Sequence, residues 1–182
     1  LIWAGGALTG DLGQSIFSNE PVFGILKGAV PTTAKLAILA LSLGIIIAVP
    51  LGIISAVYQN TAVDRASLVL AVFGQAIPNF WLGLMFILLF GVALRWLPIS
   101  GQDTIWHFVM PTVTIALSTL PQIMRLTRTG MVEVLQSDYI RAAYAKGLPA
   151  RMVILKHALR NAILPVVSIT MVTFGFLLGG TV

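Results

Sequence analysis

The chain has 182 residues, of which 58% are hydrophobic and 9% are charged, and its formal net charge is +5 at pH 7. Soluble domains contain about 25% charged residues, so the composition excludes an ordinary soluble protein and indicates an integral membrane protein. With no cysteine and two histidines, the chain excludes disulfides and thiolate-bound metals, and we expect no metal site. Because it starts at Leu1 and stops inside an apolar run, we expect it to be a fragment of a longer protein.

Four apolar segments are candidates to cross a membrane, for which a helix needs about 20 residues. Hydrocarbon offers no hydrogen-bonding partner to the backbone, so each span should be helical. We therefore predict an all-α fold, a polytopic transmembrane helical bundle that forms one domain over residues 1–182. The predicted spans cover residues 34–57, 67–94, 108–124 and 162–182.

The positions of Lys and Arg predict the orientation of the bundle, because cytoplasmic loops carry the excess of these residues. If residues 58–66 are cytoplasmic, four alternating crossings make residues 127–161 cytoplasmic too. Three basic residues then lie on the outer side: Lys27, Lys35 and Arg95. Eight lie on the cytoplasmic side: Arg65, Arg125, Arg128, Arg141, Lys146, Arg151, Lys156 and Arg160. The sequence thus predicts a multi-pass membrane protein with a basic cytoplasmic loop.

Polar side chains near Pro78 and Pro121 are candidates to line a translocation path. Gln75, Asn79 and Gln122 fall within the predicted spans, where polar groups usually face other helices or a water-filled cavity. Contact between helices is the simpler interpretation for each residue alone. The alternative is a role in the path.

The sequence shows no constellation typical of an enzyme. Asp103 and His107 lie four residues apart on a predicted outer loop, where a structural role is favoured over catalysis. We find no phosphate-binding glycine loop and no hydrolase motif, so we predict neither enzymatic activity nor a bound cofactor. A gradient-driven secondary transporter or channel with a lipid-binding basic loop is the alternative, although the predicted spans lack the central Asp, Glu or His common in such proteins.

The segment 137–167 is basic and is predicted to form a helix–turn–helix outside the membrane. Each of its five Lys and Arg residues would cost about 2.5–3.5 kcal/mol at the centre of a spanning helix. Ser137 suits an N-cap, Gly147 suits the left-handed residue that ends a helix, and Pro149 suits the first position of the next helix. Pro165 then begins the last span, which connects the second helix directly to the membrane domain.

The second helix is predicted to be amphipathic at about 100° per residue. Its polar half comprises Lys156, His157, Arg160 and Asn161, with Val153 and Arg151 as exceptions to the pattern. Its apolar half comprises Met152, Ile154, Leu155, Ala158, Leu159, Ala162 and Ile163. The basic side suits anionic lipid headgroups. Docking into a cytoplasmic protein is the other interpretation, because the small Ala142, Ala143 and Gly147 allow another backbone to approach closely.

The amino-acid sequence of this segment resembles the EAA loop of permease subunits of ATP-binding cassette importers. Arg141-Ala142-Ala143 is followed three residues later by Gly147, and Ile163-Leu164-Pro165 provides the ending. Arg141 stands where the general pattern has Glu, and the interval from Gly147 to the Leu-Pro pair is longer. Both departures resemble the dipeptide, oligopeptide and nickel branch, to which "DYIRAAYAKGL" and "KHALRNAILPVV" are similar. "GDLGQSI", "VPTTAKLAILALSLGIIIAVPLGIISA" and "IPNFWLGLMFILLFGVALRWLPISG" are similar to the first of its two paired permeases.

This resemblance implies a permease subunit in the plasma (inner) membrane of a bacterium or archaeon, with more spans than are present here. Its implied partners are a second related permease, two cytoplasmic ATPase subunits, an external substrate-binding protein and membrane lipid, without nucleic acid. ATP and Mg²⁺ would be used by the ATPase subunits. The cargo would be a dipeptide, an oligopeptide, nickel or another small solute.

The resemblance also implies roles for residues of the loop. Contact with an ATPase subunit would come from a region of residues 141–151, namely Arg141, Ala142, Ala143, Lys146, Gly147 and Arg151. Leu159, Leu164 and Pro165 would act as the lever to the transmembrane helix.

Overall fold

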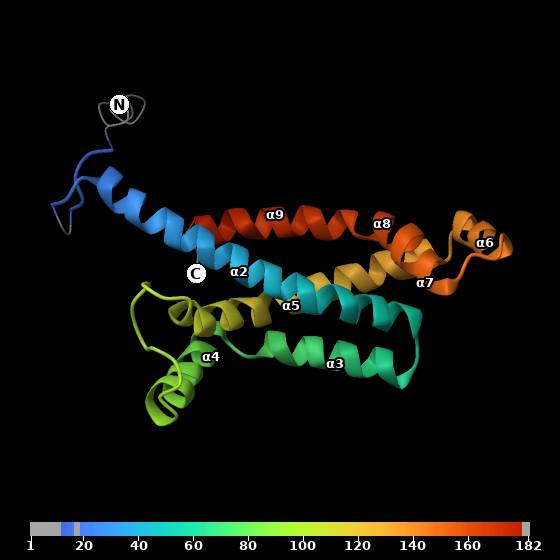
Figure 1. The fold of residues 1–182 in the computed structure, drawn as a ribbon, viewed down its shortest axis with the longest axis horizontal. Coiled ribbons are helices and arrows are strands. Elements are labelled where there is room, and N and C mark those ends of the chain that lie inside the picture. Colours follow the sequence, from blue (N-terminus) through green and yellow to red (C-terminus); the bar gives the residue numbers. More distant parts are fainter. Residues whose placement is uncertain (1–11, 17–18, 180–182) are drawn as a thin grey trace.

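The computed structural model describes residues 12–16 and 19–179, and the regular secondary structure in these residues is helical (Figure 1). An isolated bridge between Gln14 and Pro21 precedes the first helix. The predicted all-α class is confirmed. The helices are α2 (Val22–Val57), α3 (Ala62–Ala76), α4 (Asn79–Phe86), η1 (Ile87–Ala93), α5 (Trp106–Leu135), α6 (Asp138–Ala145), α7 (Ala150–Met152), η2 (Val153–Ala158), α8 (Leu159–Ala162) and α9 (Leu164–Leu178), where η1 and η2 are π-helical.

Helices α2 and α5 pack along each other and form the centre of the bundle (Figure 1). Small residues allow helices in a membrane to approach closely. A Cβ added to Gly52 would lie 2.6 Å from Thr127 Cβ and 2.8 Å from the carbonyl oxygen of Met124. The face of α2 that is buried consists mainly of small residues three or four positions apart: Ala37, Ala40, Leu41, Gly44, Ala48, Gly52, Ser55 and Ala56.

The predicted span over residues 67–94 is not one straight helix. Helix α3 ends at Ala76, α4 begins at Asn79, and the two directions differ by 86°. Pro78 has no N–H group and disfavours helical geometry in the preceding residue, and Ile77 is accordingly extended, with φ −86° and ψ 122°. The proline therefore produces a break where the sequence prediction placed a continuous span.

The described residues contain one helix, α2, that is long and apolar enough to cross a membrane. The number rises to three if α3 with the α4–η1 segment, and the 150–162 segment with α9, each count as one bent span. Helix α2 begins well before residue 34, the predicted start of the first span. Helix α5 continues past residue 127, the predicted start of the cytoplasmic segment, to Leu135. The four predicted crossings remain a prediction, and residues 180–182 of the last one lie outside the described part.

Two apolar clusters hold the bundle together. The first lies in the middle and joins Ala48, Ala71, Ile123, Met124 and Val166, from α2, α3, α5 and α9. The second lies at the α6 end, and its buried members are Ala56, Met131, Ile140, Ala143, Val153, Ala158 and Ala162. We call this second group the loop-end cluster. It makes the helix–turn–helix a packed part of the bundle.

We expect Gly52→Ala to destabilise the full-length protein by about 1–3 kcal/mol, the usual cost of overpacking. The added methyl group would meet the Met124 carbonyl oxygen, and backbone cannot move aside as a side chain can. The measurement is the thermal unfolding midpoint in detergent. Gly28→Ala is the matched control, because a Cβ there meets no atom within 4 Å. Equal midpoints for the two variants would contradict the proposed close packing.

Candidate functional site

The helix–turn–helix begins with α6 and a tight turn. Ser137 occupies the N-cap position with extended backbone, as predicted, but its hydroxyl donates to the carbonyl oxygen of Val134 at 2.6 Å and does not cap α6. Gly147 has φ +77°, the predicted left-handed conformation. On the exposed side, Arg141 pairs with Asp138 at 3.3 Å, and an exposed pair of this kind adds little stability.

The two faces of α6 differ in their surroundings. Ile140 and Ala143, three positions apart and therefore on one side of a helix, are 1% and 8% exposed within the loop-end cluster. Arg141 and Ala142 are exposed, and the exposed surface continues into the turn and α7 through Lys146, Gly147 and Arg151. We call these five residues the docking surface. Ala143 is left out of the docking surface because its side chain faces the chain's own core, and its expected contact with an ATPase subunit stays a prediction.

The second helix departs from the regular α-helix that the sequence predicted. Pro149 is the N-cap of α7 and not its first residue. The π-helical η2 follows, and its i→i+5 hydrogen bonding widens the turn, so that residues five apart lie nearer to the same side than they do in an α-helix. Val153 and Ala158 are both completely buried, although regular spacing placed Val153 with the polar half. Leu155 is 47% exposed in spite of its predicted place on the apolar side.

The predicted connection to the last helix is present. One residue, Ile163, separates α8 from α9, and Pro165 lies in the first turn of α9, as predicted. Leu159 packs against the loop-end cluster, whereas Leu164 and Pro165 are exposed. The chain bends by 49° at this point. The role of the three residues as a lever remains a prediction.

A buried ion pair near the same end escaped the sequence analysis. Asp64, in the first turn of α3, is 2% exposed and accepts hydrogen bonds at 2.7 Å from both Nε and Nη2 of Arg128 on α5. The Ser55 hydroxyl of α2 donates to Asp64 Oδ1 at 2.6 Å, and the Asn60 N–H donates to Oδ2 at 2.9 Å. We call these four residues the junction. Asp64 and Arg128 are 64 positions apart, so no short motif predicts their pairing.

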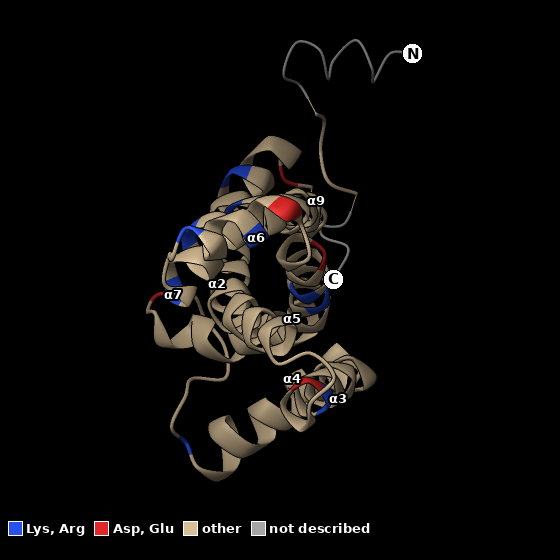
Figure 2. Cartoon of the chain, turned by 90° about the vertical axis from the view of Figure 1, so that its right-hand side faces the viewer, with Lys and Arg blue, Asp and Glu red and all other residues tan. Residues whose placement is uncertain are grey.

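Basic residues are a feature of the α6 end of the molecule. Figure 2 looks at this end and shows Lys and Arg on its helices. The five basic residues between 141 and 160 have exposed side chains, in agreement with the predicted basic surface: Arg141, Lys146, Arg151, Lys156 and Arg160. Among the residues that the structure describes, no group of three His, Cys, Asp or Glu residues could hold a metal ion.

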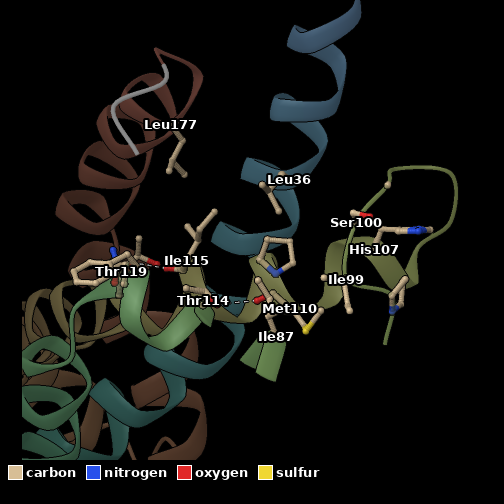
Figure 3. A pocket seen from close by; sticks show the side chains of 17 residues that line it. Leu36, Ile87, Ile99, Ser100, His107, Met110, Thr114, Ile115, Thr119 and Leu177 are labelled. Carbon is tan, nitrogen blue, oxygen red and sulfur yellow. Dashed lines mark hydrogen bonds between the residues drawn. The ribbon is translucent and has the colours of Figure 1, made fainter. Parts of the chain in front are cut away.

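A cavity of about 830 Å³ lies at the other end of the bundle, between α2, α4, η1, α5 and α9 (Figure 3). Its lining is mainly apolar, as Figure 3 shows for Leu36, Ile115 and Leu177, with hydroxyl groups from residues such as Thr119. Of the three path candidates, Asn79 lines this cavity. Gln75 and Gln122 are exposed on α3 and α5 and do not belong to its lining.

Comparison with known proteins decides the family. Residues 48–182 match the family described as the binding-protein-dependent transport system inner membrane component. This chain belongs to that family. The predicted relationship to the peptide-type branch of ATP-binding cassette importer permeases is confirmed. The match favours an ATP-driven importer over the gradient-driven alternative.

Relatives with described functions cover nearly the whole chain. A glutathione transport system permease protein from Pectobacterium atrosepticum is 41% identical over 96% of this chain, and its counterpart from Escherichia coli K12 is 40% identical over 97%. The protein of the same name from Shigella flexneri serotype 5b is also 40% identical over 97%. These relatives are described as permeases and not as enzymes. The chain spans 57% or 58% of their length.

We expect Ala143→Leu and Ala142→Leu to separate the two faces of α6. The larger side chain at position 143 must enter the loop-end cluster and should destabilise the protein by about 1–3 kcal/mol. At the exposed position 142 the same substitution should change stability by at most about 0.5 kcal/mol. Thermal unfolding of the two full-length variants in detergent measures the difference. A greater loss at position 142 would contradict the orientation of α6.

Proposed function

We propose that this chain is part of a permease subunit of an ATP-driven importer, and that its docking surface binds a cytoplasmic ATPase subunit. The observation that carries the proposal is the two-faced packing of α6. One face is held in the loop-end cluster, while the other, with Arg141, Ala142, Lys146 and Gly147, is exposed. A surface that binds a moving partner must be both accessible and attached to the part that it moves. Helix α6 meets both conditions.

The mechanism that we propose is alternating access. When ATP binding closes the two ATPase subunits, α6 moves with its partner. Because Ile140 and Ala143 pack with Met131 of α5 and Ala162 of α8, the displacement reaches α5 directly and α9 through Pro165. The permease itself makes and breaks no covalent bond. Its equilibrium shifts because ATPase subunits in their two states contact it differently.

The complete importer in this proposal contains a second related permease, two ATPase subunits that bind ATP and Mg²⁺, and an external binding protein. The relatives support a peptide-like cargo, since their names specify glutathione, which is a small peptide. Dipeptides, oligopeptides and nickel are the other cargoes implied by the motifs. We place the protein in a bacterial inner membrane with residues 127–161 in the cytoplasm, supported by the bacterial relatives and by the basic α6 end.

We expect Ala142→Leu in the full-length permease to reduce co-purification of the ATPase subunits and to reduce uptake in proteoliposomes. A bulky side chain on the docking surface should prevent close approach of the partner, while leaving the permease folded. Ala62→Leu is the control, because Ala62 is also exposed and lies on α3, outside the docking surface. Normal assembly and uptake with Ala142→Leu would refute docking at this surface.

The test must also exclude a loop that serves only to bind lipid. This alternative is tested by neutralising Lys156 and Arg160 and measuring binding to anionic liposomes. It predicts weaker binding whether or not the ATPase subunits are present. If this change abolishes uptake while Ala142→Leu does not, the basic side of the second helix is the functional one and the docking proposal fails.

We expect Asn79→Leu to raise the apparent KM for uptake by about 2- to 10-fold, the loss corresponding to one hydrogen bond. Asn79 lines the cavity, so its amide can contact a solute that passes through. Gln75→Leu and Gln122→Leu are matched controls outside the cavity and should leave KM close to that of the wild type. Equal effects of all three substitutions would contradict a path through this cavity.

A further inference from the structure

The junction is a fully paired buried charge that contacts three parts of the fold. The Asp64 carboxylate receives four hydrogen bonds, which come from Ser55 on α2, the Asn60 backbone in the α2–α3 turn, and two nitrogens of Arg128 on α5. The Asp64 side chain is 3% exposed and that of Arg128 is 20% exposed. The two ends of the α2–α3 connection are therefore held on α5 by one group.

Stability alone does not explain this arrangement. Well-packed apolar residues of similar volume can often replace a buried ion pair without loss of stability. The two parallel N–H···O bonds between a guanidinium and a carboxylate instead favour one relative orientation of the groups. The junction thus fixes how α3 lies against α5, which apolar packing would leave less strictly defined.

The position of Arg128 along α5 connects the junction with the helix–turn–helix. Beside it, Thr127 lies against Gly52 of α2. A Cβ on Gly130 would lie 2.9 Å from the carbonyl oxygen of Ala162, so α5 and α8 meet closely there. Met131 belongs to the loop-end cluster with residues of α6. A short stretch of α5 therefore contacts α2, α3, α8 and the α6 cluster in succession.

We propose that Asp64 and Arg128 are positioning residues for energy coupling. They hold the α2–α3 turn on α5. A displacement of α6 reaches α5 through Met131, and α5 then moves α3 and the following α4 with it. This inference rests on the proposed docking of α6. It assigns to the junction the transfer of movement to α3 and α4, which pack against α5.

The test uses the complete importer in proteoliposomes, with its second permease, ATPase subunits and binding protein. Asp64→Asn removes the charge, and Arg128→Lys keeps the charge but loses the two-pronged geometry. Arg125→Lys, one turn earlier on α5 and outside the junction, is the matched control. Assembly, basal ATP hydrolysis and uptake are measured on the same preparation. The decisive quantity is solute taken up per ATP hydrolysed.

We expect assembly and basal hydrolysis to persist in both junction variants, while uptake per ATP falls about fivefold or more, the lower range of coupling between sites in proteins. The double variant Asp64→Arg with Arg128→Asp should recover part of the loss. The Arg125→Lys control should retain the wild-type ratio. A purely structural role would lower the amount of assembled importer and leave uptake per ATP unchanged.

An unchanged ratio in the assembled junction variants would overturn the proposal. If neither variant assembles, Ser55→Ala removes one donor to Asp64 and serves as the milder test. The ratio must then fall by a smaller factor, and a wild-type ratio overturns the proposal. Failure of the docking surface is recognised separately, by normal assembly and uptake of Ala142→Leu.

Discussion

The close approach of α2 and α5 is the constraint on which the rest of the structure depends. Gly52 leaves no room for a side chain between the two backbones, and Gly44 is nearly as close to Thr119 of α5. This contact brings Ser55 and the α2–α3 turn within reach of Arg128. Helices α3 and α9 each contact both α2 and α5, so the separation of α2 and α5 also determines where α3 and α9 pack. The ion pair and the two apolar clusters follow from it.

The sequence predicted those features that depend on short-range rules. Gly147 and Pro165 occupy their expected positions because a left-handed helix end and a first-turn proline follow from the backbone chemistry of single residues. The break at Pro78 has the same origin, but its size depends on how neighbouring helices support the freed backbone. Pro78 accounts for the break in the predicted span, but a single proline does not specify an 86° change of direction.

Features that depend on distant residues or on an altered helical period were missed. The helical wheel assumes one period throughout, so it did not place Val153 on the buried side or Leu155 on the exposed side of the π-helical η2, although Lys156 and Arg160 are exposed as predicted. Ala143 was assigned by resemblance to a motif, which does not report which side of α6 faces the bundle. Arg128 was counted only among the cytoplasmic basic residues and Asp64 was not singled out, since their pairing depends on the packing of α2 against α5.

The cavity and the docking surface occupy opposite ends of the bundle, and α5 serves both with different residues. His107, Met110, Pro111, Thr114, Ile115, Ser118 and Thr119 of α5 line the cavity, whereas Thr127, Arg128, Gly130 and Met131 form the contacts of the α6 end. Since no residue belongs to both groups, natural selection can change one without altering the other. Under the proposed function, duplicated copies of the permease could therefore diverge in cargo through the cavity while they keep the same ATPase.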